Sequence, residues 1–485
     1  MPSSRLVASV AAATFAVGLA SHHAVAARQA SATLPLGTSA SLGGLLSSTL
    51  VFLNADTNKD GALTSAELTA AGDRWLAAAD TAGSGAVDSA ALTTALNAAM
   101  PMSALASAFN MGGNGAQPET ADPATVAAMM SALPDHAPAT PLRPRKVLVL
   151  AHAAGFVHST IPLAAKTIEA LGTKTGAWTT TITYDPADIT AANLAQYDAV
   201  FLASTTGAFL DDPNDAAATA ERRKALLDFV RGGKGLAGIH AATDSYHEDS
   251  TPPAPGGGIG ALLGSFTPGA TLAPVMLNQG DRNHDGKLDR TEMDALTGAW
   301  FRTLDRAGSG RLLQSDFAFF ALMVPQPSPA PPVAQGPDTQ VGTWPDFNKL
   351  IGGYFKFHWF DPQQITVKID DPSSPLTSMF HGRSFDVHDE IYTMGAKSWS
   401  RDNVHVLTSI DYSKMSDADK ALEEHPRADH DYGLSWIRRE GQGRVFYEAL
   451  GHSERIYAMT PILEHVLAGM QYVLGDLKAN DAPSR

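Results

Sequence analysis

Two twelve-residue stretches of the sequence, residues 56–67 and 281–292, carry oxygen-bearing side chains at matching intervals. Each has such side chains at positions 1, 3, 5 and 9, a glycine at position 6 and a glutamate at position 12. A hard cation such as calcium takes about six to eight oxygen ligands, and a short loop of this pattern can fold around it. The sequence therefore predicts two calcium sites. The expected ligands are Asp56, Asn58, Asp60, the carbonyl of Ala62, Thr64 and Glu67 in the first loop, and Asp281, Asn283, Asp285, the carbonyl of Lys287, Asp289 and Glu292 in the second.

A second, degenerate loop begins 24 residues after the start of each intact loop, which leaves about 12 residues, or one helix, between them. The degenerate loops, residues 80–91 and 305–316, keep the glycine but lose several ligand positions. Because ligand charge sets calcium affinity, we expect them to bind calcium weakly or not at all. Their remaining oxygen ligands would be Asp80, Ser84, Asp88, Asp305, Ser309 and Asp316. The two modules resemble the paired EF-hands of exported bacterial proteins, and we interpret each degenerate loop as the structural partner of its intact neighbour in the sequence.

Polar side chains also follow several strands of an expected α/β pattern. His152 and His158 follow the first strand. Thr206 follows the third strand, and His240 and Asp244 follow the fourth. The carboxyl ends of parallel strands meet at one edge of a sheet, where open α/β folds bind ligands. An imidazole there can act as a general base or as a metal ligand, although a single histidine can equally be a hydrogen-bonded structural residue.

The elements that would position these residues alternate between short apolar runs and helical stretches, which predicts βαβ units and a parallel sheet. Strands are expected at residues 146–151, 180–184, 199–203 and 236–240, with helices at 162–171 and 217–230. After an interruption, the pattern resumes with a helix near 344–352, strands near 365–369, 404–409, 434–438 and 445–447, and a closing helix at 456–474. The glycine-rich residues 232–235 precede a strand, so we interpret them as a helix-to-strand turn and not as a phosphate-binding loop.

Composition shifts divide the chain into domains. We expect a signal peptide at 1–26, an EF-hand pair at 42–100, a linker at 101–145, an α/β domain formed by 146–251 and 339–476, and a second EF-hand pair inserted at 252–338 between proline-rich flanks. Arg5 precedes an apolar run, and Ala24 and Ala26 supply the small residues of a cleavage site. Cleavage would place the protein in a bacterial periplasm or outside the cell. The alternative is an uncleaved anchor, although the run is shorter than the roughly 20 residues that span a bilayer.

The overall composition limits the partners of the protein. The net charge of −15 at pH 7 disfavours nucleic acid and anionic membranes. We expect no membrane association after signal cleavage, because no later segment is long and apolar enough to be a membrane helix. The chain contains no cysteine, which excludes disulfides, thiolate zinc sites and a cysteine nucleophile.

Six motifs stand in order along the two parts of the α/β domain. They are Gly-Phe-Val-His-Ser at 155–159, Thr-Thr-Gly at 205–207, Gly-Leu-Ala-Gly-Ile-His-Ala-Ala-Thr-Asp at 235–244, Ile-Gly-Gly-Tyr-Phe at 351–355, Val-His-Asp-Glu-Ile-Tyr at 387–392 and Gly-Arg-Val-Phe-Tyr-Glu-Ala-Leu-Gly-His at 443–452. Together they resemble the ThuA-like (trehalose-utilisation) family. The resemblance implies the class I glutamine amidotransferase-like fold, with a flavodoxin-like, doubly wound and mostly parallel sheet, and it implies a link to sugar metabolism. Amidotransferases of that fold carry a cysteine in the turn that here holds His240, so their thiol chemistry is ruled out.

The same motifs supply the candidate site residues. We expect His240, Asp244, His158 and Glu390 as catalytic residues, and Thr206, Tyr354, His358 and His452 as substrate-binding residues. Such a nitrogen and oxygen set suits zinc or another divalent ion. Four aromatic residues form either a platform for a sugar face or part of the core, namely Tyr354, Trp359, Tyr392 and Trp436.

Two functions fit these observations. In the first, the protein is an exported, calcium-binding ThuA-like protein that acts on or binds a carbohydrate near His240, and its calcium modules stabilise or position it. In the second, the α/β domain is a non-catalytic scaffold or ligand-binding unit, and calcium binding is the activity. The presence of His240, Asp244 and Glu390 favours the first.

Overall fold

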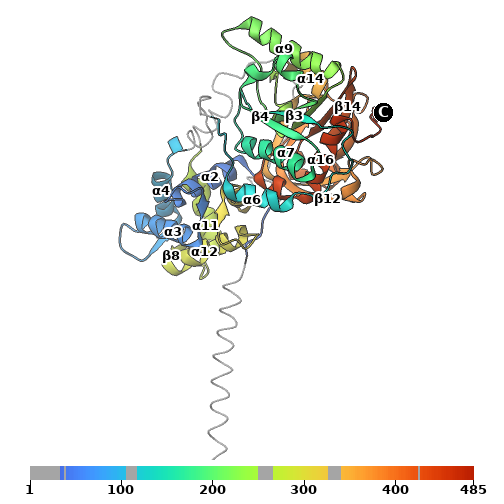
Figure 1. Ribbon diagram of the computed structural model, residues 1–485. Helices are drawn as coiled ribbons and strands as arrows, with labels where there is room; N and C mark the ends of the chain where they lie inside the picture. Colours follow the sequence, from blue (N-terminus) through green and yellow to red (C-terminus); the bar gives the residue numbers. More distant parts are fainter. Residues whose placement is uncertain (1–32, 38–39, 105–116, 250–265, 326–339, 424–425) are drawn as a thin grey trace, which may run out of the picture. The chain divides into compact units, whose positions relative to one another are not determined.

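The computed structural model describes residues 33–37, 40–104, 117–249, 266–325, 340–423 and 426–485 (Figure 1). The chain forms two compact units, each built from segments that are far apart in the sequence. Within the described residues, the EF-hand unit comprises 33–37, 41–104 and 266–325, and the α/β unit comprises residue 40 with 117–249, 340–423 and 426–485. The expected signal peptide lies outside the described residues.

The EF-hand unit is helical, with short strands in its loops (Figure 1). Its first segment contains α2 (Leu42–Ala55), β1 (Ala62–Leu63), α3 (Ser65–Ala79), β2 (Ala86–Asp88) and α4 (Ser89–Ala99). Its second segment contains α11 (Pro268–Gly280), β8 (Lys287–Asp289), α12 (Arg290–Leu304), β9 (Leu312–Leu313), α13 (Gln314–Phe317) and the 3-10 helix η3 (Ala318–Met323). α3 and α12 start with capping boxes, in which the position-9 side chain, Thr64 or Asp289, accepts from the backbone N–H of the loop glutamate. Positions 9 and 12 of each intact calcium loop therefore also form the N-terminal cap of the helix that follows the loop.

The loops pair across the two segments, which corrects the interpretation that each degenerate loop pairs with its neighbour in the sequence. β1 pairs with β9 and β2 pairs with β8, both antiparallel. Each intact loop therefore faces the degenerate loop of the other segment. The reason is that α3 alone separates the first two loops, and α12 alone separates the last two. A helix of 15 residues is about 22 Å long, so the loops at its two ends lie too far apart to pair with each other.

Helix packing joins the same two segments. α3 packs on α12 and α4 packs on α11, and Figure 1 shows the first pair side by side. A β-carbon at Gly72 would lie 2.8 Å from Thr297 Cγ2, and one at Gly269 would overlap the carbonyl oxygen of Thr93. Glycine at these two positions lets the helices approach closely. The EF-hand unit is thus one composite core that needs both segments.

The α/β unit is built on a nine-stranded sheet with the order β12-β11-β13-β14-β15-β6-β5-β3-β4. The strands are β3 (Lys146–Leu150), β4 (Thr179–Thr183), β5 (Ala199–Ala203), β6 (Gly235–Ile239), β11 (Phe355–Ile369), β12 (Phe385–Met394), β13 (His405–Ile410), β14 (Gly433–Glu440) and β15 (Gly443–Glu448). β4, β3, β5, β6 and β15 are mutually parallel, in the flavodoxin-like order 2-1-3-4-5. Only β11 and β14 run against the other seven strands. The predicted doubly wound, mostly parallel sheet is confirmed.

Helices cover both faces of this sheet. α7 (Ile161–Thr175) and α16 (Thr460–Leu474) share one face, where their side chains meet β5 and β6. α9 (Ala216–Arg231) and α14 (Pro345–Ile351) contact each other on the opposite face. α6 (Pro123–Ala132) packs against α7, and its Met129 is fully buried. Part of the stretch 101–145 that we expected to be a linker therefore belongs to the core of the α/β unit.

Most expected elements occur within a few residues of their predicted positions. The turn at 232–235 joins α9 to β6, as predicted. β11 starts ten residues before the expected 365, and β12 was not expected at all. The closing helix begins at Thr460, because the 3-10 helix η6 (Glu454–Ala458) occupies the residues before it.

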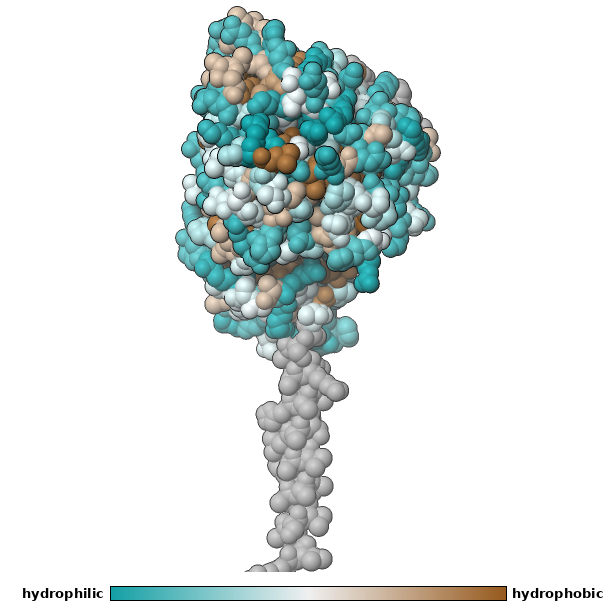
Figure 2. Space-filling model, turned by 45° about the vertical axis from the view of Figure 1, so that its right-hand side comes forward, coloured by the Kyte–Doolittle hydropathy of each residue, from teal (hydrophilic) through white to brown (hydrophobic). Residues whose placement is uncertain are grey.

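The two ends of the inserted segment are held together in the α/β unit. β7 (His247–Asp249), the last described element before the inserted segment, pairs antiparallel with β10 (Gln340–Gly342), the first described element after it. No helix within the described residues is long and apolar enough to cross a membrane. On the face shown in Figure 2, hydrophilic residues dominate and hydrophobic residues form only small separate patches.

Candidate functional site

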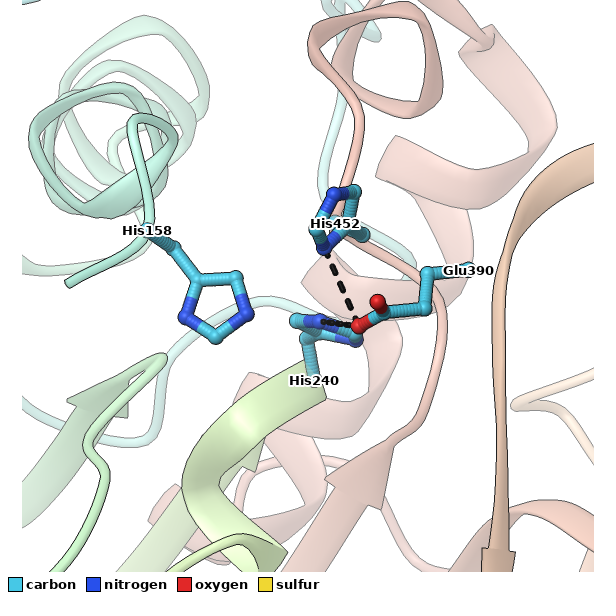
Figure 3. A group of neighbouring side chains, drawn as sticks. All are labelled: His158, His240, Glu390 and His452. Carbon is cyan, nitrogen blue, oxygen red and sulfur yellow. Dashed lines mark ion pairs between the residues drawn. The ribbon is translucent and has the colours of Figure 1, made fainter. Parts of the chain in front are cut away.

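Four side chains from distant parts of the α/β unit converge at the carboxyl edge of the sheet (Figure 3). His158 follows β3, His240 follows β6, Glu390 lies in β12 and His452 follows β15. One donor atom from each of the four lies within 4.8 Å of the others. Three imidazoles and one carboxylate are the ligand types that zinc and similar divalent ions prefer.

The Glu390 carboxylate is central to the group. Its Oε2 lies 3.3 Å from His240 Nε2 and 3.1 Å from His452 Nδ1. Its Oε1 lies 3.1 Å from His358 Nδ1. His158 completes the group through its ring, whose centroid is 4.9 Å from that of His240 and 5.2 Å from that of His452. The carboxylate therefore faces three imidazoles directly.

The local fold explains how Glu390 and His358 reach β6, although β11 and β12 stand at the far end of the sheet. β11 pairs with β13 only from Val367 to Ile369, and Val367 lies opposite Ile410, the last residue of β13. Its pairing with β12, in contrast, continues back to Phe355. The first part of β11 and the last part of β12 thus extend beyond the carboxyl edge as a two-stranded arm. This arm carries His358 and Glu390 to the histidines that follow β3, β6 and β15.

His240 is oriented by contacts on its other side. Its Nδ1 donates to the carbonyl of Ala449 at 3.0 Å, which directs Nε2 toward Glu390. Nε2 is fully buried and makes no hydrogen bond within the described residues. His240 has a positive φ of 45°, and its carbonyl accepts from Tyr447 Oη at 2.6 Å. A buried imidazole nitrogen that faces a carboxylate without a hydrogen bond is the arrangement expected where a cation lies between them.

The loop that carries His452 is held by a second carboxylate. Asp389 accepts from the backbone N–H groups of Gly451 at 2.7 Å, Ser453 at 2.9 Å and His452 at 3.3 Å. Asp361 in turn accepts from the hydroxyl of Ser453 at 2.6 Å. Neighbouring residues of β12 therefore have two tasks, since Glu390 contacts the imidazoles and Asp389 fixes the loop of one of them.

Burial and mutual proximity shift the charges in this group. Burial alone would raise the pKa of Glu390, but His358 and His452 hold it well below its usual range. Burial alone would lower the pKa of His452, but the carboxylates of Glu390, Asp361 and Asp389 raise it to about 10. Burial and the nearby imidazoles depress the pKa of His158. With no metal bound, Glu390 and His452 thus form an ion pair, in which the carboxylate is the more buried partner.

Part of the site reaches the surface. The side chains of His358 and His452 are 27% and 26% exposed, whereas that of His240 is completely buried. Phe156 is 49% exposed, and its ring lies edge-on to His158 with centroids 4.8 Å apart. A ligand would therefore approach past His358, His452 and Phe156.

Three of the remaining predicted residues, Asp244, Thr206 and Tyr354, have other contacts. Asp244 pairs with His247 Nε2 at 2.6 Å. Thr206 accepts from Gly155 N and donates to the carbonyl of Phe156, which shapes the loop before His158. Tyr354 is 6% exposed and stacks on His247. Of the residues expected to bind substrate, His358 and His452 are the two that contact Glu390.

Of the two roles left open for the four aromatic residues, the structure shows the core. Tyr354, Trp359, Tyr392 and Trp436 are all buried. The exposed aromatic residue beside the site is Phe156, which the sequence interpretation did not single out. The available signal was its place in the loop after the first strand, two residues before His158.

The two intact calcium loops have the compact geometry that their pattern requires. In the first, Asp56 accepts from Gly61 N at 3.1 Å, and Asn58 accepts from Asp60 N at 2.9 Å. The second repeats these bonds at equivalent positions. Asp56 Oδ1 is buried without a hydrogen-bond partner, which fits an oxygen reserved for a cation.

Comparisons with known proteins agree with this description. The family model of ThuA, described as trehalose utilisation, matches residues 146–262 and 333–473, more than half of the chain. The EF-hand model matches residues 50–70 and 275–296. No curated protein matches the chain.

Two similar solved structures are ThuA-like proteins. One, from Bacteroides uniformis, is 15% identical with a TM-score of 0.38, and the match covers 71% of this chain and 98% of that protein. The other, from Parabacteroides merdae, is 12% identical with a TM-score of 0.36, and the match covers 70% of this chain and 93% of that protein. By the extent of the family match, this chain belongs to the ThuA (trehalose utilisation) family, and it carries calcium-binding EF-hand motifs in addition.

Proposed function

We propose that the α/β unit is a metal-dependent enzyme that acts on a carbohydrate, and that the protein is exported and binds calcium in its EF-hand unit. One observation carries the proposal. Three imidazoles converge on a buried carboxylate, and His240 Nε2 faces that carboxylate without a hydrogen bond. His158, His240, Glu390 and His452 would hold a divalent ion such as zinc. When bound, that ion would supply Lewis acidity toward a hydroxyl or carbonyl oxygen of the sugar.

The side chains around this group have distinct tasks. The bond from Nδ1 to Ala449 leaves His240 Nε2 as the donor atom, and Asp389 fixes the loop of His452. His358 contacts the outer oxygen of Glu390 and is partly exposed, so it is placed to give or take a proton at the mouth of the site. Three of the four proposed ligands, His158, His240 and Glu390, are buried, which limits the access of water to them.

The carbohydrate part of the proposal has two supports. The family is described by trehalose utilisation. Phe156 offers an exposed ring at the open side, next to His158, and aromatic rings commonly pack against apolar faces of ligands in binding sites. A sugar bound on this ring would have its hydroxyl groups within reach of the buried group.

Metal analysis tests the first step. The protein is freed of calcium with a calcium-selective chelator, exposed to zinc, and analysed by mass spectrometry for metal content. We expect about one zinc per chain, lost in Glu390→Gln and in His240→Ala, and retained in the control His136→Ala, whose imidazole is exposed and distant in the sequence from all four ligands. Equal zinc in all four proteins would contradict the proposal.

Turnover then tests the reaction. The zinc-loaded protein is incubated with a panel of disaccharides, including trehalose and oxidised disaccharides, and the products are followed by NMR. We expect turnover of at least one sugar that depends on Glu390. Product formation that is unchanged in Glu390→Gln would assign the activity to another site.

A second function, a non-catalytic calcium-binding scaffold, is favoured by one observation. The group offers four protein ligands, the number that structural zinc sites use, whereas catalytic sites keep one position open. A protein that retains zinc, gains thermal stability from it and turns over none of the sugars would support this alternative.

Export has its own test. The N-terminal sequence of the protein recovered from outside the cytoplasm is determined. A start after Ala26 would support cleavage at the expected position, and recovery of the uncleaved chain only in the cytoplasm would refute it.

A further inference from the structure

An arginine of one degenerate loop lies against an intact calcium loop. Arg311 Nη2 is 3.0 Å from Asp60 Oδ2, and Asp60 is the position-5 ligand of the first intact loop. The crosswise strand pairing creates this contact, because Ala62 lies opposite Leu313 and Leu63 opposite Leu312. The residue facing this calcium site therefore comes from the other segment of the chain.

The second pair of loops has no equivalent arginine. Arg311 occupies position 7 of its loop, and the same position in the loop facing residues 281–292 is Ala86. Asp285 is the counterpart of Asp60. It forms no ion pair within the described part of the chain, and its Oδ2 accepts a hydrogen bond from the Asn283 side chain. The two intact loops thus differ in the charge that their partner loops present.

The glutamates at position 12 of the two intact loops, Glu67 and Glu292, also differ, and this difference again favours the loop at residues 281–292. Glu292 is 7% exposed, and its carboxylate spans its loop, with Oε1 accepting from Arg282 N at 2.9 Å and Oε2 from Asp289 N at 3.1 Å. Within the described residues, Glu67 Oε2 accepts from Thr64 alone, from its N at 2.9 Å and its Oγ1 at 2.8 Å. The second intact loop is therefore the better organised of the two around its bidentate ligand.

We propose that the two intact loops bind calcium unequally, with the tighter site at residues 281–292, and that Arg311 weakens the site at residues 56–67. Calcium at the weaker site must detach Asp60 from the guanidinium or bind beside a fixed positive charge. The proposal rests on calcium binding by the intact loops. It assigns to one degenerate loop the task of setting the affinity of its partner.

The size of the effect follows from Coulomb's law. A unit charge roughly 6 Å from a divalent ion at a surface with water-like screening changes the binding constant about tenfold in the absence of salt. At physiological ionic strength, a Debye length of about 8 Å reduces this to roughly threefold. The contact is exposed, with side-chain exposures of 56% for Arg311 and 44% for Asp60, so the screened values apply.

Titration calorimetry of the full chain with calcium tests the proposal. The variant Glu292→Gln isolates the first site, and Glu67→Gln isolates the second. We expect Glu67→Gln to bind calcium more tightly than Glu292→Gln. Adding Arg311→Ala to Glu292→Gln should tighten binding about threefold near 0.15 M salt and about tenfold at low salt.

Two controls separate this effect from others. Arg302→Ala removes the same charge from an exposed position on α12 and should change the calcium affinity less than about twofold. Arg311→Gln keeps most of the side-chain volume and should behave as Arg311→Ala does. Unchanged or weaker binding in both Arg311 variants, or a tighter site in Glu292→Gln than in Glu67→Gln, would overturn the proposal. If Glu67→Gln and Glu292→Gln together leave calcium binding intact, calcium binding by these loops itself is refuted.

Discussion

Substitution of Glu448 by glutamine should make the α/β unit more stable at alkaline pH. Glu448 ends β15, directly before Ala449, whose carbonyl orients His240. Its side chain is 2% exposed, with Oε1 accepting from Leu450 N at 2.9 Å and Oε2 lying 3.3 Å from His465 Nε2. His465 Nδ1 donates to a backbone carbonyl, so its Nε2 is an acceptor, and this atom lies 3.0 Å from Ser435 Oγ as well as near Glu448.

The magnitude follows from the proton balance of folding. Burial raises the pKa of Glu448 from its ordinary value of 4.5 to about 8. Between these values the folded state binds a proton that the unfolded chain has released, so stability is lost as the pH rises from about 4.5 to about 8. At 1.36 kcal/mol for each pH unit, the loss by pH 8 is roughly 4 kcal/mol. Glutamine stays neutral in both states and can still accept from Leu450 N.

Urea unfolding at pH 5 and at pH 8, in saturating calcium, measures the effect. Tryptophan fluorescence reports mainly on the α/β unit, which contains five of the seven tryptophans. We expect Glu448→Gln to match the unsubstituted protein at pH 5 and to exceed it by several kcal/mol at pH 8. The control Glu221→Gln, at an exposed position on α9, should show no such change. Equal pH dependence in the variant and the unsubstituted protein would refute the reasoning.

Three further predictions test other contacts. Gly269→Ala should destabilise the EF-hand unit by about 1–3 kcal/mol and weaken calcium binding, because the new β-carbon would overlap the backbone of Thr93. Unchanged thermal unfolding of the calcium-bound protein would contradict this packing. Asp389→Asn should release the loop of His452 and thereby lower the zinc affinity about 10- to 100-fold in competition with a zinc indicator. An unaltered affinity would show that other contacts hold the loop. Phe156→Ala should weaken sugar binding about tenfold in NMR titrations with little change in zinc affinity; equal loss of both would indicate a structural role.

The local patterns were predictable because they need only neighbouring residues. The calcium loops follow from side-chain spacing, and the expected ligands Thr64 and Asp289 also cap the helices that follow. The crosswise pairing was not predicted, although its cause was visible in the spacing. All four loops have an apolar residue at position 8, so that residue could not show which loops pair, and only the length of the single helix between loops decides it.

The candidate site was predictable in part. His158 and His240 follow strands of the parallel sheet, and the order of such strands brings their ends together. Glu390 and His358 reach the site only because β11 and β12 extend beyond the carboxyl edge, and this arm depends on where the pairing with β13 stops. Pro362, inside β11, breaks the local strand signal, so the sequence pattern placed the start of that strand at 365.

The division between site and core could not be read from residue type alone. Tyr354 and Trp359 are residue types that can bind a sugar face, but both are buried in the hydrophobic core. Asp244 stands in a motif with His240 and yet pairs with His247. In each case burial and side-chain direction, which depend on contacts far apart in the sequence, decide the role.

X-ray absorption spectroscopy of the zinc-loaded protein tests the central claim most directly, because it counts the imidazoles bound to the metal. With calcium sites filled by calcium, we predict zinc with nitrogen and oxygen ligands at about 2.0–2.2 Å, with the scattering of three imidazoles. The variant His240→Ala should lose one of the three imidazoles or lose the metal. A spectrum with oxygen ligands only, or one that His240→Ala leaves unchanged, would contradict a metal centre formed by His158, His240, Glu390 and His452.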